Sequence, residues 1–232
     1  RSMGSLFDTE LTRQANGIRQ KFGSDQGTII LGCIGREDKL ISAPYIEAVA
    51  NILDSIPDAI YIWSGRTESK DVQNLIDRSG ISEKCQYIGW VNTQLYAQVI
   101  DIVVDSFPFA SGLTAFESMA AGNPVVGLIT PESLGTAYIN HMWPGYSGSI
   151  DDAEIHAHIK GIFTNKKGAS LLPFCETIEQ YTQFAIHLGV DQMFRREAGA
   201  AAQNFVSTYM HDDLKMASSF TDHIIELIDH KS

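Results

Sequence analysis

The chain has 232 residues, of which 44% are hydrophobic and 19% are charged, so it is long enough to bury one substantial core. Its formal net charge is −11, and no cluster of lysine and arginine interrupts the acidic surplus, which argues against binding to nucleic acid. No apolar run approaches the roughly 18 residues that a membrane span requires.

The first five residues, Arg-Ser-Met-Gly-Ser, are typical of an expression scar, and residues 6–22 have the polar, amphipathic pattern of a lead-in helix. We therefore expect residues 1–24 to be scar and lead-in helix, and residues 25–232 to form one domain. From about residue 151 the pattern is helical, which predicts a helical tail within that domain.

Five short apolar, β-branched runs alternate with segments of helical spacing. The expected strands cover residues 28–35, 59–63, 85–89, 102–105 and 124–129. The expected helices cover residues 44–53, 70–79, a short segment that Thr93 would cap, 112–121, 151–164, 176–188, 190–208 and 212–229. This alternation predicts an α/β fold, a Rossmann-like, doubly wound parallel sheet followed by the helical tail.

Ligands of such sheets bind at the carboxyl ends of the strands, so the loops after residues 35, 64, 89 and 106 are the candidates for a site. The first of these loops carries Arg36 and Lys39, and two cations three residues apart suit a diphosphate. The alternative is that both are solvated surface charges paired with Glu37 and Asp38.

The loop after residue 106 runs through a small-residue turn into a helix. Glycine in the turn lets a ligand approach the backbone closely, and the free N–H groups of the first helical turn, with the helix dipole, favour a phosphate. Thr114 lies in that turn, and its hydroxyl adds a further donor. Glu117 follows on a helix that is otherwise rich in apolar residues, where an acid needs a partner or a ligand such as a ribose diol. The alternative is an exposed glutamate on the helix surface, or an acid that compensates the helix dipole near the N-terminus.

The loop after residue 89 offers the main-chain N–H and C=O of Val91 to the edge of a nucleobase. We expect Trp90 to be a packing residue, with a stacking platform as the alternative, and Arg66 to be an ordinary loop cation. No histidine or cysteine has metal-ligand spacing, so no metal site is predicted. Cys33, Cys85 and Cys175 are expected to be buried free thiols, which is typical of a cytoplasmic protein.

Taken together, these loops resemble the donor-binding domain of GT-B glycosyltransferases. The run from Gly112 to Val126 resembles the donor-site signature of that family, and Gly35-Arg36 with Lys39 resembles its first-strand motif. The segment from Tyr87 to Val103 is similar to the part between them. The ordered motifs cover about residues 28–130, which makes the resemblance specific.

The resemblance implies a role for each of these residues toward a nucleotide sugar, with a UDP-sugar as the expected donor. Arg36 and Lys39 would hold the pyrophosphate and neutralise the leaving diphosphate, together with the amides of residues 112–114. Glu117 would bind the ribose, and Val91 would contact the base. No metal or other cofactor is then needed, since cations and a helix end supply the charge.

One departure bears on the subfamily. Retaining members carry a glutamate where this chain has Phe109. The local sequence instead resembles the inverting branch of protein O-GlcNAc transferase and the bacterial adhesin N-glucosyltransferases, although that branch usually has a histidine at the position of Gly112.

The family builds its active site between two domains, and this chain supplies only the donor half. An N-terminal acceptor domain is therefore an expected partner, and the isolated chain is expected to transfer little or no sugar. Two alternatives stay open: a GT-B sugar-nucleotide epimerase, and a non-catalytic GT-B-like interaction module.

Overall fold

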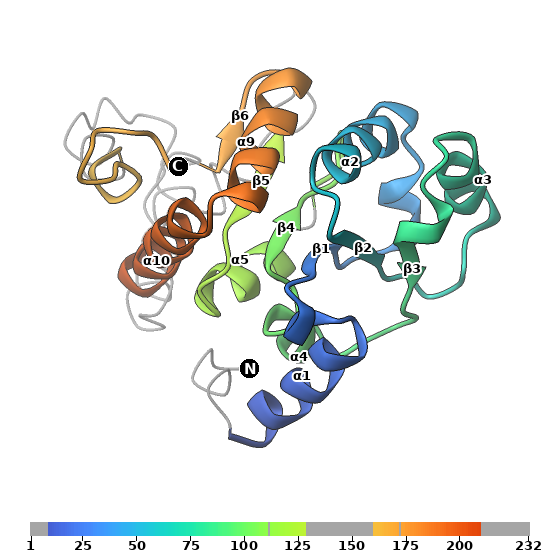
Figure 1. The fold of residues 1–232 in the computed structure, drawn as a ribbon, viewed down its shortest axis with the longest axis horizontal. Coiled ribbons are helices and arrows are strands. Elements are labelled where there is room, and N and C mark those ends of the chain that lie inside the picture. Colours follow the sequence, from blue (N-terminus) through green and yellow to red (C-terminus); the bar gives the residue numbers. More distant parts are fainter. Residues whose placement is uncertain (1–8, 111, 129–159, 172, 210–232) are drawn as a thin grey trace, which may run out of the picture.

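In the computed structural model, residues 9–110, 112–128, 160–171 and 173–209 are described, and a parallel sheet lies at the centre of the fold (Figure 1). Its strands are β1 Ile29–Cys33, β2 Ala59–Trp63, β3 Cys85–Tyr87, β4 Ile102–Val104, β5 Val125–Leu128 and β6 Phe174–Cys175. They lie in the order β3-β2-β1-β4-β5-β6. This order confirms the predicted Rossmann-like sheet, and the direction of winding reverses between β1 and β4, where such sheets bind their ligands.

The helices cover both faces of the sheet. They are α1 Thr9–Lys21, α2 Ala43–Ser55, α3 Lys70–Arg78, α4 Thr93–Ala97, α5 Leu113–Ala120, α9 Ile178–Val190 and α10 Gln192–Tyr209, with short 3₁₀ turns η2 Ser24–Gln26, η3 Glu37–Leu40 and η4 Ser82–Lys84. Helices α2 and α9 pack against each other on one face, and α4 and α5 lie together on the other (Figure 1). Helix α10 contacts both α5 and α9, so it joins the two layers.

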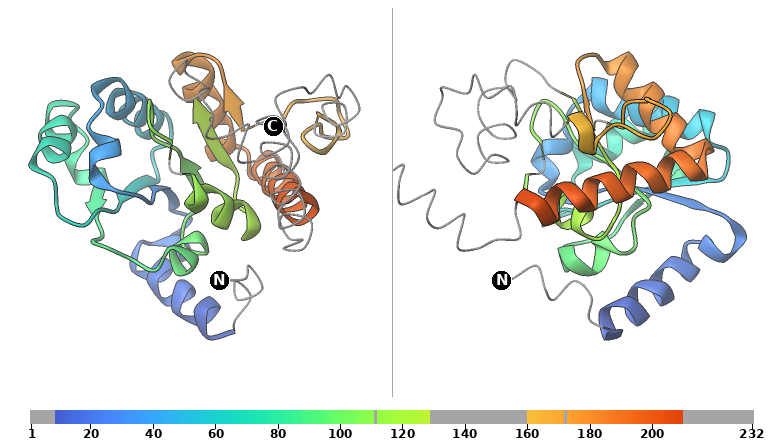
Figure 2. Two further views of the ribbon diagram at one scale, coloured as in Figure 1. Left: turned by 180° about the vertical axis from the view of Figure 1, so that it is seen from behind. Right: turned by 90° about the vertical axis from the view of Figure 1, so that its left-hand side faces the viewer.

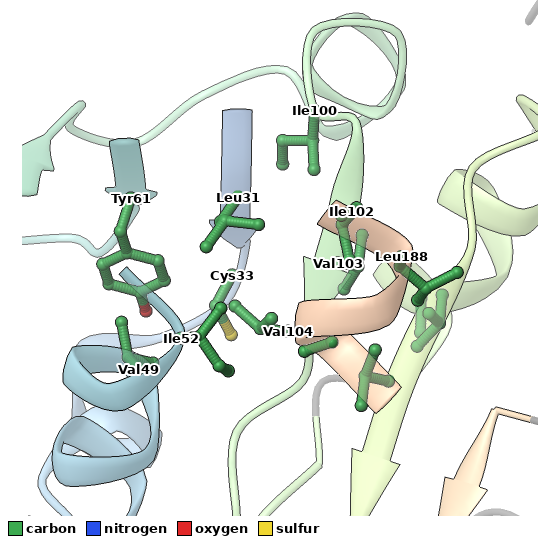
Figure 3. Close-up of a cluster of buried hydrophobic side chains, with 14 of the residues drawn as sticks. Leu31, Cys33, Val49, Ile52, Tyr61, Ile100, Ile102, Val103, Val104 and Leu188 are labelled. Atoms are coloured by element: carbon green, nitrogen blue, oxygen red, sulfur yellow. The ribbon is translucent and has the colours of Figure 1, made fainter. Parts of the chain in front are cut away.

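The core forms because the central strands are apolar on both faces, as parallel strands under two helical layers must be. Leu31 and Tyr61 are fully buried in β1 and β2. Figure 3 shows Val49 and Ile52 of α2 beside these strands, and Leu188 of α9 beside β4.

Helix α1 is held to the edge opposite the candidate loops. Arg19 donates to the carbonyl of Val99 (2.6 Å) and to the carboxylate of Asp101 (2.8 Å), and Ala15 is buried. Both views in Figure 2 place α1 on the side away from α2 and α9. Within the described residues, no helix combines the length and the apolar content needed to cross a bilayer.

Two details differ from the sequence prediction. The side chain of Asn92, not Thr93, caps α4, because its Oδ1 accepts hydrogen bonds from the N–H groups of Gln94 and Leu95. The two-residue strand β6 was not predicted, because so short a segment has no readable alternation. The predicted helix at 212–229, and most of that at 151–164, lie outside the described residues.

Candidate donor site

A pocket of about 150 Å³ opens where the loops after β1, β2 and β3 meet the start of α5. Four of the residues predicted from the sequence line it: Arg36, Lys39, Val91 and Thr114. The rest of the lining consists of Ile34, Gly35, Ser64, Trp90 and Thr93. The fold therefore brings together candidates that lie up to 78 residues apart in the sequence (36 to 114).

The two cations leave the end of β1 together. Arg36 precedes η3 in extended backbone, and buried Leu40 anchors the other end of that turn. Arg36 is 3.4 Å from the carboxylate of Asp38, and both side chains are more than half exposed. Exposed ion pairs contribute at most about 1 kcal/mol, so Arg36 can leave Asp38 for an anionic ligand at little cost. Lys39 instead donates to the main-chain carbonyl of Ala110, which ties η3 to the loop after β4.

The start of α5 closes the pocket on the other side of the switch point. Gly112 has φ of +67°, a left-handed conformation that a side chain would disfavour, and α5 begins at the next residue without a side-chain cap. Its first-turn N–H groups are therefore oriented as an anion site requires. The hydroxyl of Thr114 donates to the carbonyl of Ile34 (2.8 Å), which joins this turn to β1. Leu113 is 65% exposed.

Glu117 lies one turn further along α5 and does not line the pocket itself. Its Oε2 atom is buried and has no hydrogen-bond partner among the described residues. Burying a polar atom without a partner costs about 1–3 kcal/mol. A buried oxygen without a partner in the ligand-free protein is what we expect of an atom that accepts a hydrogen bond from a ligand. The side chain as a whole is partly buried, so it is not an exposed glutamate on the helix surface.

The loop after β3 forms the opposite wall. Gly89 has φ of +78° and turns the chain, so that Trp90 is 64% exposed at the rim of the pocket. The exposure of Trp90 contradicts the expectation of a packing residue and favours the alternative of a stacking platform. The guanidinium of Arg66 lies over its ring, with Cζ 5.6 Å from the ring centroid, so Arg66 is more than a solvated loop cation. Within the described residues, the main-chain N–H and C=O of Val91 make no hydrogen bond.

The loop between β4 and α5 is fixed from below by aromatic side chains. Buried Phe107 packs edge-on between Tyr45 and Tyr181, with ring centroids 5.4 and 5.3 Å away. Tyr181 also donates to the carbonyl of Asp105 at 3.0 Å. Phe109 is 62% exposed. The loop is thus rooted in the core while its tip faces outward.

Sequence reasoning missed two residues that organise the site. The hydroxyl of buried Ser64 both accepts from the N–H of Gly35 (2.9 Å) and donates to its carbonyl (3.1 Å). The carboxylate of Glu37 accepts from the N–H of Arg66 and the hydroxyl of Thr67 instead of pairing with the neighbouring cations. Its own backbone N–H and that of Arg66 lower the pKa of this carboxyl. The position of Ser64 directly after a predicted strand was a usable signal, whereas the partners of Glu37 were not readable.

In the described part of the chain, no group of three or more histidine, cysteine, aspartate or glutamate side chains has the geometry of a metal site. The cysteines are free, with Cys33 and Cys175 buried and Cys85 partly buried. Burial raises the pKa of the Cys33 thiol to about 12, so it is not a nucleophile at neutral pH. His187 stacks on Phe194 far along the chain in α9 and α10.

The comparisons with known proteins bear on the fold. No known protein family and no curated protein sequence matches this chain. Among solved structures, the chain is similar to a variant of the O-GlcNAc transferase of Thermobaculum terrenum, with a TM-score of 0.62 and 18% identity over 85% of this chain and 35% of that one. It is also similar to a glycosyltransferase from Rickettsia africae, with a TM-score of 0.62 and 14% identity over 95% of this chain and 54% of that one.

A third similar structure is a single domain. It is the C-terminal domain of a group 1 family glycosyl transferase (LpcC) from Francisella tularensis, with a TM-score of 0.54, 17% identity, and coverage of 82% of this chain and 91% of that one. In contrast, the chain spans only about a third of the length of the O-GlcNAc transferase. The chain therefore has the fold of one domain of the GT-B glycosyltransferases, and among these structures it covers most of the length of a C-terminal domain.

Proposed function

We propose that this chain is the donor-binding domain of a GT-B glycosyltransferase and that its pocket binds a UDP-sugar. The observation that carries the proposal is the convergence of Arg36, Lys39 and the first turn of α5 around one pocket whose far wall is Val91 and Trp90. A cationic end suits a diphosphate, and a wall with an exposed ring and unpaired main-chain groups suits a base.

The chemistry assigned to these residues is electrostatic. When the bond between the anomeric carbon and the β-phosphate oxygen breaks, negative charge grows on the departing diphosphate. Arg36, Lys39 and the amides of Gly112, Leu113 and Thr114 would stabilise that charge without a metal. The buried oxygen of Glu117 would accept from the ribose hydroxyls.

The acceptor side of the reaction is assigned to a separate N-terminal domain. Support comes from the apolar side chains of Trp90, Phe109 and Leu113, each more than 60% exposed at this edge of the sheet. Exposed apolar side chains on loops beside a candidate site are typical of a surface that another domain covers. Phe109 in place of an acid supports the inverting branch of the family.

The test is calorimetric titration of the chain with UDP, GDP, ADP and inorganic pyrophosphate, with and without a divalent metal. We expect weak, metal-independent binding that prefers UDP. Lys39→Ala should weaken UDP and pyrophosphate alike, by about 10- to 100-fold, because a charge-assisted contact to the diphosphate is lost.

Lys21→Ala is the matched control. It removes the same charge from the exposed end of α1, at the opposite edge of the sheet, and should change neither affinity. Absence of nucleotide binding at millimolar concentration would contradict the proposal and favour a non-catalytic module. An equal loss in both variants would reduce the role of Lys39 to overall charge.

A further inference from the structure

The side chain of Glu37 does not pair with the cations that flank it in the sequence. It stands between two cations of the candidate site, yet its side chain turns to the loop after β2. Oε2 accepts from the N–H of Arg66 (2.8 Å), and Oε1 accepts from the hydroxyl of Thr67 (3.1 Å). The side chain also lies flat on Gly65, where an added Cβ would be 2.9 Å from the Cβ of Glu37. The carboxylate is thus a bridge between two loops.

The bridge belongs to a series of hydrogen bonds across three strand ends. Ser64 is bonded to Gly35 on one side, as described above, and the N–H of Gly65 donates to the carbonyl of Gly89 (3.3 Å) on the other. The hydroxyl of Tyr87 donates to the carbonyl of Gly65 at 3.0 Å. The residue after this fixed segment is Arg66, which lies over the ring of Trp90.

The neighbouring carboxylate has a different task. Asp38 faces Arg36 at 3.4 Å, so it is the residue that lies against a phosphate-binding cation. Lys39 is committed to the carbonyl of Ala110. Glu37 therefore does not neutralise the cationic end of the pocket. Its carboxylate accepts its two hydrogen bonds from the backbone of Arg66 and the side chain of Thr67.

We propose that Glu37 is a positioning residue for the base-binding wall: it fixes the loop at residues 65–67 and so holds the Arg66–Trp90 pair at the rim of the pocket. This assignment rests on the proposed function, since it supposes that a nucleobase lies against that rim. It distinguishes adjacent carboxylates, of which Glu37 orders the base end of the pocket while Asp38 only offsets charge at the phosphate end.

The two roles predict opposite signs. Removing a negative charge beside a phosphate site favours binding of any diphosphate. The Asp38→Ala variant should therefore bind UDP and inorganic pyrophosphate at least as tightly as the wild-type chain does. Glu37→Ala removes the same charge but also releases the loop, which must then be ordered when the base binds. We expect UDP to bind about fivefold to tenfold more weakly in this variant, while pyrophosphate binding is unchanged or tighter. Glu37→Gln, which keeps one acceptor oxygen, should lie between.

A second measurement uses the protein without ligand. Trp90 emission, isolated by subtracting the spectrum of a Trp90→Phe variant of each protein, reports the order of the wall. Quenching by neutral acrylamide should rise in Glu37→Ala and stay at the wild-type value in Asp38→Ala. Circular dichroism and the melting temperature establish that each variant is folded.

The outcomes separate the two proposals. Unchanged Trp90 quenching in folded Glu37→Ala overturns the positioning role, whatever happens to nucleotides. Increased quenching together with an equal change in UDP and pyrophosphate affinity overturns the link to the base. If the wild-type chain binds pyrophosphate but shows no added affinity for UDP, the proposed function fails at the base end, although the loop bridge stands on the quenching result.

Discussion

The unpaired oxygen of Glu117 permits a test in which stability and binding should move in opposite directions. Oε2 is buried on α5 with no hydrogen-bond partner among the described residues, and the buried residues of this helix are apolar except for Ser118. Replacing Glu117 by leucine removes the unpaired oxygen and keeps a side chain of comparable length. The ligand-free protein should therefore gain stability, while the proposed ribose contact disappears.

The magnitudes follow from the two halves of this exchange. An unsatisfied buried polar atom costs about 1–3 kcal/mol, so the free energy of unfolding should rise by roughly that amount. For a chain of this size, the melting temperature should rise by about 2–10 °C. Loss of hydrogen bonds to a carboxylate costs about 1.5–3 kcal/mol, which weakens UDP by about 10- to 100-fold. Inorganic pyrophosphate has no ribose, so its affinity should not change.

Thermal melts and calorimetric titrations of Glu117→Leu provide both numbers, with Glu47→Leu as the control. Glu47 is exposed on α2, and its replacement should shift stability by no more than about 0.5 kcal/mol and leave both affinities alone. A lower melting temperature in Glu117→Leu would mean that the carboxylate is satisfied in the free protein. An equal loss of affinity for UDP and for pyrophosphate would show that Glu117 does not contact the ribose, and would refute the reasoning.

Two further predictions concern the scaffold. A Cβ on buried Gly199 of α10 would lie 2.0 Å from the carbonyl oxygen of Gly122, whereas one on Gly17 of α1 meets nothing within 4 Å. Gly199→Ala should therefore lower the free energy of unfolding in urea by about 1–2 kcal/mol despite better helix propensity, and Gly17→Ala should raise it by about 0.5–1 kcal/mol; a gain in both would show that α10 does not pack closely on the end of α5. For pH, burial raises the pKa of the Cys33 thiol to about 12, so the unfolded chain loses this proton first. The stability that the neutral thiol contributes is complete below the unfolded pKa of about 8.5 and should fall by up to about 1.4 kcal/mol per pH unit above it. Cys33→Ala should show a shallower fall between pH 8.5 and 10, and an identical slope in both proteins would contradict the burial of this thiol.

The strand pattern was predictable because each signal is local. Apolar β-branched runs ended by glycine or by a polar turn predict β1, β2 and β4 from a few neighbouring residues, and parallel order follows from the helices between them. The candidate residues Arg36 and Thr114 were also readable, since each follows directly on a predicted strand or begins a predicted helix.

What escaped prediction depends on contacts between distant segments. The partners of Glu37 lie 29 and 30 residues away, and the hydroxyl of Tyr181 reaches Asp105 across 76 residues. Trp90 was misjudged because an aromatic residue after a strand usually packs inside, but the left-handed turn at Gly89 directs it outward. The spacing of apolar residues in the sequence does not reveal that this turn directs the next side chain outward.

The same geometry explains why the proposed domain should bind its nucleotide weakly by itself. Arg36, Lys39 and Thr114 each have an intramolecular partner in the free chain, so a diphosphate must replace or share those contacts before it gains its own. The binding free energy therefore contains only the difference between the contacts made to the ligand and the intramolecular contacts that it replaces. The exposed ring of Trp90 lines the pocket, and the exposed ring of Phe109 lies on the loop between β4 and α5. The chain spans about a third of the O-GlcNAc transferase that it is similar to. A covering domain would exclude water from these charges and strengthen each contact to the diphosphate. The exposure of the charges to water would then account for weak binding by the single domain, and their shielding would account for effective transfer in a two-domain enzyme.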